Sequence, residues 1–364
     1  MGKVLIEESN LQAIADSIRS KNGTQETYLP SEMSTAIDNI SGGGGIPDWS
    51  LIGYEDVPDD VIDMFNFSKN IYDNWDSNST SLKNNTDYRA VVIFPFIDTS
   101  NVTNMSQSFS YYQSLKRIPL LNTSKVAYMS STFSNCEKLK TIPLLDTSNV
   151  IIMNSMFAQC YALESIPLLN TSKVTSVSSM FKNCYALSSI PLLDTSNCSS
   201  MDNMFNACRS LTNIPLYDTS NATTMSYTFS GCSSLTSIPS LDTGKVTNMS
   251  RTFSGCSSLT SIPLLNTSKV TNMSSMFTDC TSLVSVPLLD TSSVTNMLNL
   301  FSANCLALSD ESLNNILKMC ANSMVTTTAN RKLSKIGITN SDLISRIQSL
   351  SNYQEFINAG WTIN

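Results

Sequence analysis

The stretch IPLLNTSKVAYMSSTFSNCEKLKT at residues 118–141 decides the fold, because its pattern recurs every 24 residues from residue 94 to residue 308. Nine prolines and nine phenylalanines keep this step: Pro95, Pro119, Pro143, Pro167, Pro191, Pro215, Pro239, Pro263 and Pro287, with Phe109, Phe133, Phe157, Phe181, Phe205, Phe229, Phe253, Phe277 and Phe301. A period this strict is typical of a solenoid, in which one small unit stacks on copies of itself. We therefore predict nine stacked rungs.

Other apolar residues also recur at fixed positions, and we expect them to point inward. The columns are Leu115 to Leu283, Met105 to Met297 with Val177 in one gap, Ile118 to Ile262 followed by Val286, and Val102, Val126, Val150 and Val174. Within a unit, L-x-x-I-P-L predicts a short strand, and the D-T-S or N-T-S that follows predicts a turn. Val102, Met105 and Phe109 have helical spacing, which predicts one or two helical turns opposite the strand. The expected fold class is thus an α/β solenoid.

Composition limits the classes of partner and of chemistry. A net charge of -7 and a pI near 4.7 argue against a nucleic-acid partner, which needs clustered Lys and Arg. The chain has no histidine, the commonest general base and metal ligand. No apolar run reaches membrane-spanning length, so we expect no membrane span. The opening MGKVLIEESN does not match a signal peptide, so we expect synthesis and folding in a cytoplasm.

The wording V-T-N-M-S-S-M-F-x-x-C-x-x-L at residues 270–283 resembles the BspA-like repeats of bacterial surface proteins. The combination of a strand, an inward Leu/Ile frame and a short helix also resembles a leucine-rich repeat. This resemblance implies a surface for binding and adhesion, with no enzymatic activity and no cofactor.

The first 45 residues are outside the repeat. NLQAIADSIRSKNGT at residues 10–24 and LPSEMSTAIDNI at residues 29–40 resemble a short N-terminal module of bacteriophage tail and baseplate proteins. The resemblance implies a virion-attachment hairpin, and its two apolar helix faces are Leu11, Ile14 and Ile18, and Met33, Ile37 and Ile40. The C-terminal LSNYQEFINAGWTIN at residues 350–364 also resembles the end of such proteins.

Five segments follow from these patterns. We expect a helical hairpin at 1–41, a glycine linker at 42–45, an N-terminal cap at 46–93, the solenoid at 94–308 and a C-terminal cap at 309–364. Caps of atypical sequence are expected at both ends of a solenoid, because they cover the last open rung.

Two recurring columns carry residue types that can bind metal ions. The cysteines Cys136, Cys160, Cys184, Cys208, Cys232, Cys256 and Cys280, with Cys305 one residue late, lack a CxxC spacing, so we predict buried free thiols. The Asx column is Asp98, Asn122, Asp146, Asn170, Asp194, Asp218, Asp242, Asn266 and Asp290. Stacked carboxylates could bind calcium, but turn chemistry and alternation of charge between early rungs account for the column better. We predict no metal site.

The candidate ligand-binding residues are those that interrupt the repeat consensus. Tyr161 and Tyr185 share one position on adjacent rungs, in a column that also holds Arg209. Tyr128 and Ile152 form a second adjacent pair. Aromatic residues on a polar face can stack on sugars and often anchor interfaces. The alternative is that they only shield neighbouring rungs.

The hypothesis drawn from both resemblances is a bacteriophage tail-tip or baseplate receptor-binding protein, located in the virion tail after assembly in the host cytoplasm. Its expected partners are a host cell-surface glycan or protein and other tail proteins. The sequence leaves open whether the protein forms a homo-oligomer. A bacterial surface adhesin of the BspA-like type and a structural decoration protein of the virion are the alternatives. The net negative charge makes a polyanionic ligand the less favoured kind.

Overall fold

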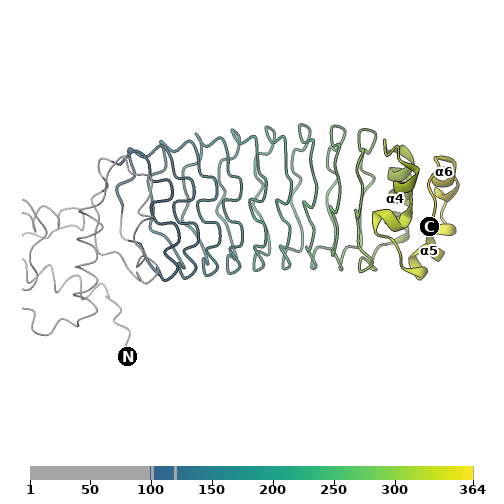
Figure 1. Ribbon diagram of the computed structural model, residues 1–364, viewed down its shortest axis with the longest axis horizontal. Coiled ribbons are helices and arrows are strands. Elements are labelled where there is room, and N and C mark those ends of the chain that lie inside the picture. The colour runs from purple at the N-terminus through teal and green to yellow at the C-terminus, as the bar shows by residue number, and fades with distance from the viewer. Residues whose placement is uncertain (1–98, 100–101, 119–120, 364) are drawn as a thin grey trace, which may run out of the picture. The chain divides into compact units, whose positions relative to one another are not determined.

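The computed structural model describes residues 99, 102–118 and 121–363. Apart from residue 121, these residues fall in one compact unit of the chain. Figure 1 shows this unit as a stack of similar rungs that ends in the helices of the C-terminal region. The hairpin expected at 1–41 with its attachment residues Leu11 to Ile40, the linker at 42–45 and the cap at 46–93 lie outside the described residues.

Each rung is joined to the next by backbone hydrogen bonds at a step of one repeat. In the Met-to-Phe segment, Ser155 N donates to Ser178 O at 2.9 Å and Phe157 N donates to Met180 O at 2.9 Å. The intervening amides bond within their own rung, as when Ala158 N donates to Ser155 O at 3.0 Å. Neighbouring rungs meet as isolated parallel bridges, for example at Tyr128 and Ile152. The described part of the chain therefore contains a leucine-rich-repeat-like solenoid with a 24-residue step.

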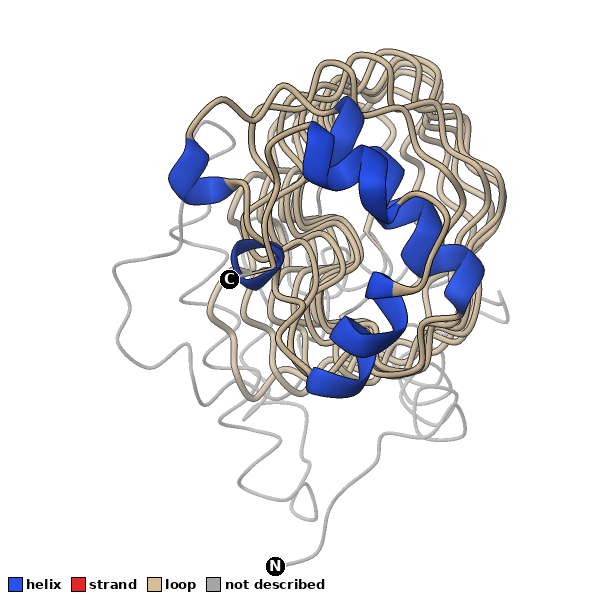
Figure 2. Cartoon of the chain, turned by 90° about the vertical axis from the view of Figure 1, so that its right-hand side faces the viewer, coloured by secondary structure: helices blue, strands red, loops and turns tan. Residues whose placement is uncertain are grey.

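The expected helical turns are wrong, and the rungs contain turns instead. Ser155 and Gln159 have left-handed φ values of 56° and 63°, and the equivalent positions of the other described rungs repeat this, except at Ala303 on the last rung. A left-handed residue every four positions ends any right-handed helix before it can propagate. The strand expected at L-x-x-I-P-L is reduced to an isolated bridge between Ser261 and Ser285. Figure 2 accordingly draws the described rungs as loops, with helices at the C-terminal end.

The buried columns predicted from the sequence are confirmed. The phenylalanine rings from Phe109 to Phe301 are at most 1% exposed, and consecutive rings stack with centroids 5.4–5.9 Å apart. Met153, Leu163 and Val150 are fully buried beside them. Stacking one such unit on the next makes the core continuous through the solenoid, so no rung needs a core of its own.

The cysteine column is buried, as predicted, and all ten cysteines are free thiols. Each thiol of the column also has a bonding role: Cys160 Sγ donates to Phe133 O at 3.1 Å, and Cys184 Sγ donates to Phe157 O at 3.1 Å. Burial raises the pKa of Cys232 to about 12, which keeps this thiol protonated near neutral pH. The column thus joins rungs as a small hydrogen-bonding core residue.

The C-terminal end of the solenoid is closed by three α-helices and two 3-10 helices. They are α4 (Asp310–Asn322), η3 (Thr328–Asn330), η4 (Leu333–Ile336), α5 (Ser341–Gln348) and α6 (Tyr353–Asn358). Ser309 caps α4 by accepting from Ser312 N, and Asn340 caps α5 by accepting from Asp342 N and Leu343 N. None of the helices in the described residues is both long and apolar enough to cross a membrane.

The last rung bonds to this cap as if another rung followed. Asn299 N donates to Lys335 O at 2.7 Å, and Phe301 N donates to Ile336 O at 2.8 Å, so η4 supplies the carbonyls that a further rung would supply. Gly337, with φ 90°, ends η4 against the Phe301 backbone, where a Cβ would collide with the Phe301 carbonyl. At the C-terminal end of the solenoid the amides of Asn299 and Phe301 are therefore paired, which protects this edge from pairing with another chain.

Candidate binding surface

Three of the predicted residues form one stack on the outside of the solenoid. The rings of Tyr161 and Tyr185 lie parallel, with centroids 4.9 Å apart and an interplanar angle of 6°. The Arg209 guanidinium carbon lies 4.4 Å from the Tyr185 ring centroid. These residues occupy one position on three successive rungs, so the 24-residue step itself brings them together. We call Tyr161, Tyr185 and Arg209 the aromatic stack.

The same column begins with two polar side chains on the rungs before. Gln113 Nε2 donates to Glu137 Oε1 at 2.8 Å, and Glu137 occupies the position one rung before Tyr161. Partial burial raises the pKa of Tyr161, with smaller contributions from Tyr185 and the Glu137 carboxylate. Tyr161 Oη also donates to Gln159 Oε1 at 3.1 Å. These contacts hold Tyr161 in place.

The geometry changes what the stack can do. Tyr161 and Arg209 lie on the rungs before and after Tyr185, so both faces of the Tyr185 ring are occupied within the protein. A sugar ring stacking on Tyr185 would have to displace one of them. What remains available to a partner is the ring edges, the Tyr185 hydroxyl and the guanidinium. Within the described part of the chain, the Arg209 guanidinium makes no hydrogen bond or ion pair, so its contact in the structure is the stacking on Tyr185.

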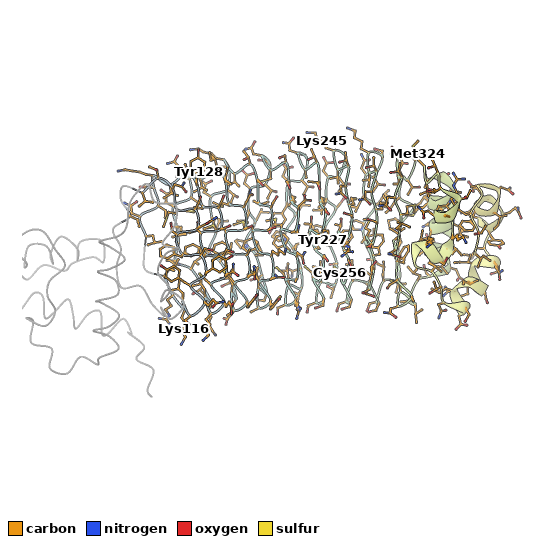
Figure 3. All side chains as sticks on the ribbon, in the orientation of Figure 1. Lys116, Tyr128, Tyr227, Lys245, Cys256 and Met324 are labelled. Atoms are coloured by element: carbon orange, nitrogen blue, oxygen red, sulfur yellow. The ribbon has the colours of Figure 1, made fainter. Side chains whose placement is uncertain are left out.

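The second predicted pair lies at another edge of the rungs. Tyr128 and Ile152 are neighbours across a parallel bridge, and Tyr128 is 42% exposed. Figure 3 shows Tyr128 at the upper edge of the stack of rungs and Lys116 at the lower edge. At the same position in four other described rungs an asparagine caps the following turn, as when Asn272 Oδ1 accepts from Ser274 N at 3.0 Å. Tyr128 and Ile152 replace this cap with apolar surface, and their binding role stays a prediction.

The Asx column makes turns, as expected. Asp194 Oδ1 accepts from Ser196 N at 3.0 Å and from Ser196 Oγ at 2.6 Å, and these two bonds lower the pKa of Asp194. Two lysines of the neighbouring column donate to amide oxygens: Lys173 Nζ to Asn149 Oδ1 at 2.8 Å and Lys245 Nζ to Asn221 Oδ1 at 2.6 Å. Among the residues that the structure describes, no group of three His, Cys, Asp or Glu could hold a metal ion.

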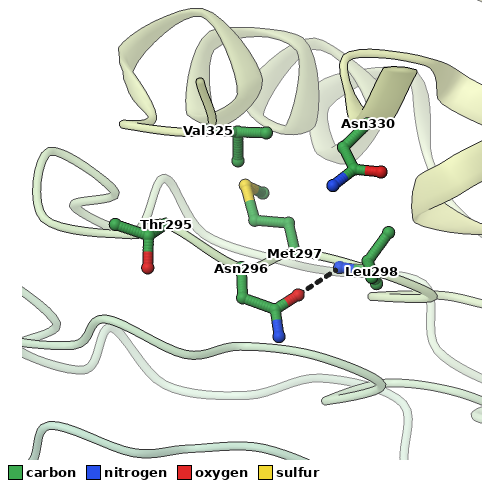
Figure 4. A pocket seen from close by; sticks show the side chains of 6 residues that line it. All are labelled: Thr295, Asn296, Met297, Leu298, Val325 and Asn330. Atoms are coloured by element: carbon green, nitrogen blue, oxygen red, sulfur yellow. Dashed lines mark hydrogen bonds between the residues drawn. The ribbon is translucent and has the colours of Figure 1, made fainter. Parts of the chain in front are cut away.

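A small hollow lies where the last rung meets the cap (Figure 4). Its lining comprises Thr295, Asn296, Met297, Leu298, Val325 and Asn330. Asn296 Oδ1 accepts from Leu298 N at 3.1 Å across its floor, which repeats the turn cap of other rungs. The six residues that line the hollow include no titratable group.

The sequence prediction missed a column of exposed leucines. In P-L-L the second leucine is buried, whereas the first points outward, as in Leu144 at 65% and Leu168 at 62% exposed. The signal was present in the sequence. Two adjacent residues of an extended segment point to opposite sides, so Leu144 and Leu145 cannot both face the core.

Among solved structures, the chain is similar to three bacterial leucine-rich-repeat proteins. The T. pallidum protein is 22% identical, with 65% of this chain and 86% of that chain covered and a TM-score of 0.28. The Bacteroides ovatus protein is 20% identical, with 60% and 69% covered and a TM-score of 0.24. A leucine-rich cell surface protein from Faecalibacterium prausnitzii is 20% identical, with 58% and 76% covered and a TM-score of 0.26. Superpositions this loose carry no argument about the site.

No curated protein matches the chain. A family model described as "Mycoplasma protein of unknown function, DUF285" matches at four overlapping places, residues 76–190, 103–216, 159–260 and 199–316. The matches run through the rungs that carry the buried phenylalanine and cysteine columns, and together they span more than half of the sequence. The chain therefore belongs to the DUF285 family of bacterial repeat proteins.

Proposed function

We propose that this chain is a non-enzymatic binding protein, displayed at a bacterial cell surface, whose solenoid holds a glycan or protein of another cell. The observation that carries the proposal is the aromatic stack. Arg209 is held by stacking on Tyr185 while its hydrogen-bond donors are left for a partner. Tyrosine and arginine are the residues most enriched among those that dominate binding energy at interfaces.

The position of the stack within the repeat supports this proposal. In the later rungs the same position carries Ser233, Ser257 and Thr281, which are small residues close to the consensus. The first rungs carry larger side chains there and add a carboxylate at Glu137. Folding alone requires only a small residue at this position, as the later rungs show. The larger side chains of the earlier rungs are therefore the ones that we assign to binding.

The partner that fits is one with an acidic or carbonyl-rich group beside an apolar edge. The guanidinium offers a fork of donors that matches a carboxylate, and stacking on Tyr185 reduces the entropy lost on binding. Such groups occur both in surface proteins and in glycans that carry uronic or sialic acids.

The test uses the full chain labelled with a fluorophore, on a glycan array and on panels of bacterial and mammalian cells. Arg209→Ala should weaken binding by roughly 30-fold, the scale of a 2 kcal/mol anchor. Arg251→Ala is the matched control, because Arg251 also lies over a tyrosine ring, Tyr227 at 5.3 Å, but in another column. If both variants bind as the wild type does, the aromatic stack is not the site.

A second candidate keeps the binding solenoid and changes the particle that carries it. The sequence of residues 10–40 supports a bacteriophage tail tip or baseplate, with Leu11, Ile14, Ile18, Met33, Ile37 and Ile40 facing the virion. The family match favours the cellular carrier instead, because the family is described from a bacterium. Antibody labelling of intact cells and of purified phage particles separates the two. If phage carry the protein and free protein does not block their adsorption, it is a decoration protein.

A further inference from the structure

Six exposed leucines follow one line along the solenoid, and we call them the leucine ridge: Leu144, Leu168, Leu192, Leu216, Leu264 and Leu288. The first five are 60–67% exposed and Leu288 is 39% exposed. Each follows a half-buried proline, and Ser240 takes this position on the rung between Leu216 and Leu264. The ridge lies in a different column from the aromatic stack, so it is a separate feature of the surface.

The ridge is held rigidly because the chain on its N-terminal side is bonded from rung to rung. Glu164 N donates to Lys140 O at 2.9 Å, and Val284 N donates to Thr260 O at 2.9 Å. Ile142 and Leu145 are 7% and 3% exposed, so both face the core and Leu144 between them faces outward. One leucine therefore stands on each of six rungs, about 5 Å from its neighbour where two rungs are adjacent.

The exposed apolar area is large enough to matter. At ~100 Å² for a fully exposed leucine side chain, the six residues present on the order of 400 Å² in a single line. The six leucines alone would supply about half of the ~800 Å² that each partner of a standard interface buries, and the polar side chains beside them would supply the rest. This apolar line, interrupted at Ser240, falls in the range of roughly 300–600 Å² of the largest apolar patch on a typical monomer, and such patches are often functional.

We propose that the leucine ridge joins two copies of this chain side by side in a parallel dimer. A second copy is the partner that carries leucines at the same period over the same length. A two-fold axis along the solenoid then brings each leucine beside its equivalent at the same height, and Ser240 beside Ser240. Such an interface is self-complementary, as dimers with two-fold symmetry require.

The flanking charges favour the parallel over the antiparallel arrangement. The exposed aspartates Asp146, Asp194, Asp218, Asp242 and Asp290 lie on the C-terminal side of the ridge, two residues after the leucine position. The exposed bases Lys116, Arg117 and Lys140 lie on its N-terminal side, where Glu164 is paired with Lys140 at 2.9 Å. At equal heights a parallel two-fold pair sets Asp146 of one copy against Lys140 of the other, and it sets the later aspartates against uncharged residues such as Ser188, Thr212 and Thr236. An antiparallel pair would set aspartates against aspartates, which is unfavourable.

The mass of the full chain in solution tests the dimer, against 39.8 kDa for one copy. Wild type should sediment as a dimer at micromolar concentration. Leu192→Ser with Leu216→Ser should weaken dimerisation by at least tenfold. Serine is compatible with the rung at this position, because Ser240 already occupies it. Ser240→Leu should tighten the dimer, and Leu306→Ser, exposed but off the ridge, should leave it unchanged. A monomeric wild type at 100 µM, or ridge variants that dimerise like wild type, would overturn the proposal.

Oxidative cross-linking tests the orientation. All ten native cysteines are buried, so Leu288→Cys adds the accessible thiol. In a parallel dimer the two introduced thiols lie at the same height, and mild oxidation should give a disulfide-linked dimer on a non-reducing gel. An antiparallel dimer would place residue 288 near residue 144 of the other copy. It would cross-link only in a mixture of Leu288→Cys and Leu144→Cys chains, and that result would refute the parallel arrangement.

Discussion

Exchanging glycine and alanine in one left-handed column should change stability in opposite directions. Gly231 and Ala207 occupy equivalent positions on adjacent rungs, with φ values of 74° and 62°. A Cβ added at Gly231 would lie 3.3 Å from Ala207 Cα and 3.5 Å from Ala207 N. Alanine thus stands where glycine is preferred, and glycine stands where alanine would be both strained and crowded.

The magnitude follows from two opposing terms. A left-handed conformation costs a non-glycine residue roughly 1–2 kcal/mol. Replacing glycine by alanine also restricts the unfolded chain, which favours folding by about 0.4–1 kcal/mol. Gly231→Ala should therefore lower the free energy of unfolding by about 1 kcal/mol, with the close contact to Ala207 adding to the loss. Ala207→Gly should raise it by somewhat less than 1 kcal/mol.

Urea unfolding followed by circular dichroism measures both changes as shifts of the midpoint, with the slope checked because a solenoid can unfold in stages. Gly244→Ser is the matched control. Gly244 does not have a positive φ, and serine stands at this position in neighbouring rungs, bonded to the aspartate or asparagine before it, as Ser268 is to Asn266 at 2.8 Å. It should be neutral or stabilising. The reasoning fails if Gly231→Ala is as stable as wild type while Gly244→Ser is not.

Three further outcomes follow. Burial raises the pKa of Cys232 to about 12, so the stability that the protonated thiol contributes is fully present below about pH 9 and is lost as the pH rises above it. The urea midpoint should fall over this pH range, and it should fall less in Cys232→Ala. Hydrogen bonds from Ser196 lower the pKa of Asp194, so the stability that the carboxylate contributes is present above about pH 4 and is lost as the pH falls through the lowered pKa. Asp194→Asn keeps the turn, and the free energy of unfolding of this variant should depend less on pH in acid. Gly337→Ala should displace η4 and speed hydrogen exchange at the Phe301 amide, seen by mass spectrometry, while central rungs keep their protection.

The sequence predicted the architecture of the solenoid well, because the buried positions carry the same apolar residue types every 24 residues. The columns through Phe157, Cys160 and Leu163 are all buried as expected. The helical turns were wrong for a specific reason. A turn with two left-handed residues four positions apart also brings every third or fourth side chain inward, so Met153 and Phe157 keep helix-like spacing without a helix. Ser155, Gln159 and most equivalent residues are not glycine, which hid the left-handed positions.

The candidate surface was partly predictable. Tyr161, Tyr185 and Arg209 share one position of the 24-residue repeat, which predicted that they lie side by side. The sequence could not show that the two rings and the guanidinium stack on one another. The cap at η4 was also beyond prediction. It accepts hydrogen bonds from the amides of Asn299 and Phe301 through backbone carbonyls, and backbone carbonyls are the same in every residue type, so the sequence does not reveal them. The N-terminal resemblance falls on residues outside the described part of the chain.

The cap that accepts the last rung's amides makes length an adjustable property of this protein. Each rung offers the amide pattern that Asn299 and Phe301 offer to η4, so the cap could close a shorter or longer stack equally well. The amino-acid sequence already holds nearly identical neighbouring rungs, because SGCSSLTSIP occurs at both 230–239 and 254–263. Unequal recombination between these copies would remove or add one whole rung in frame. A lineage could thus alter its reach by about 5 Å per event while the terminal structures stay the same.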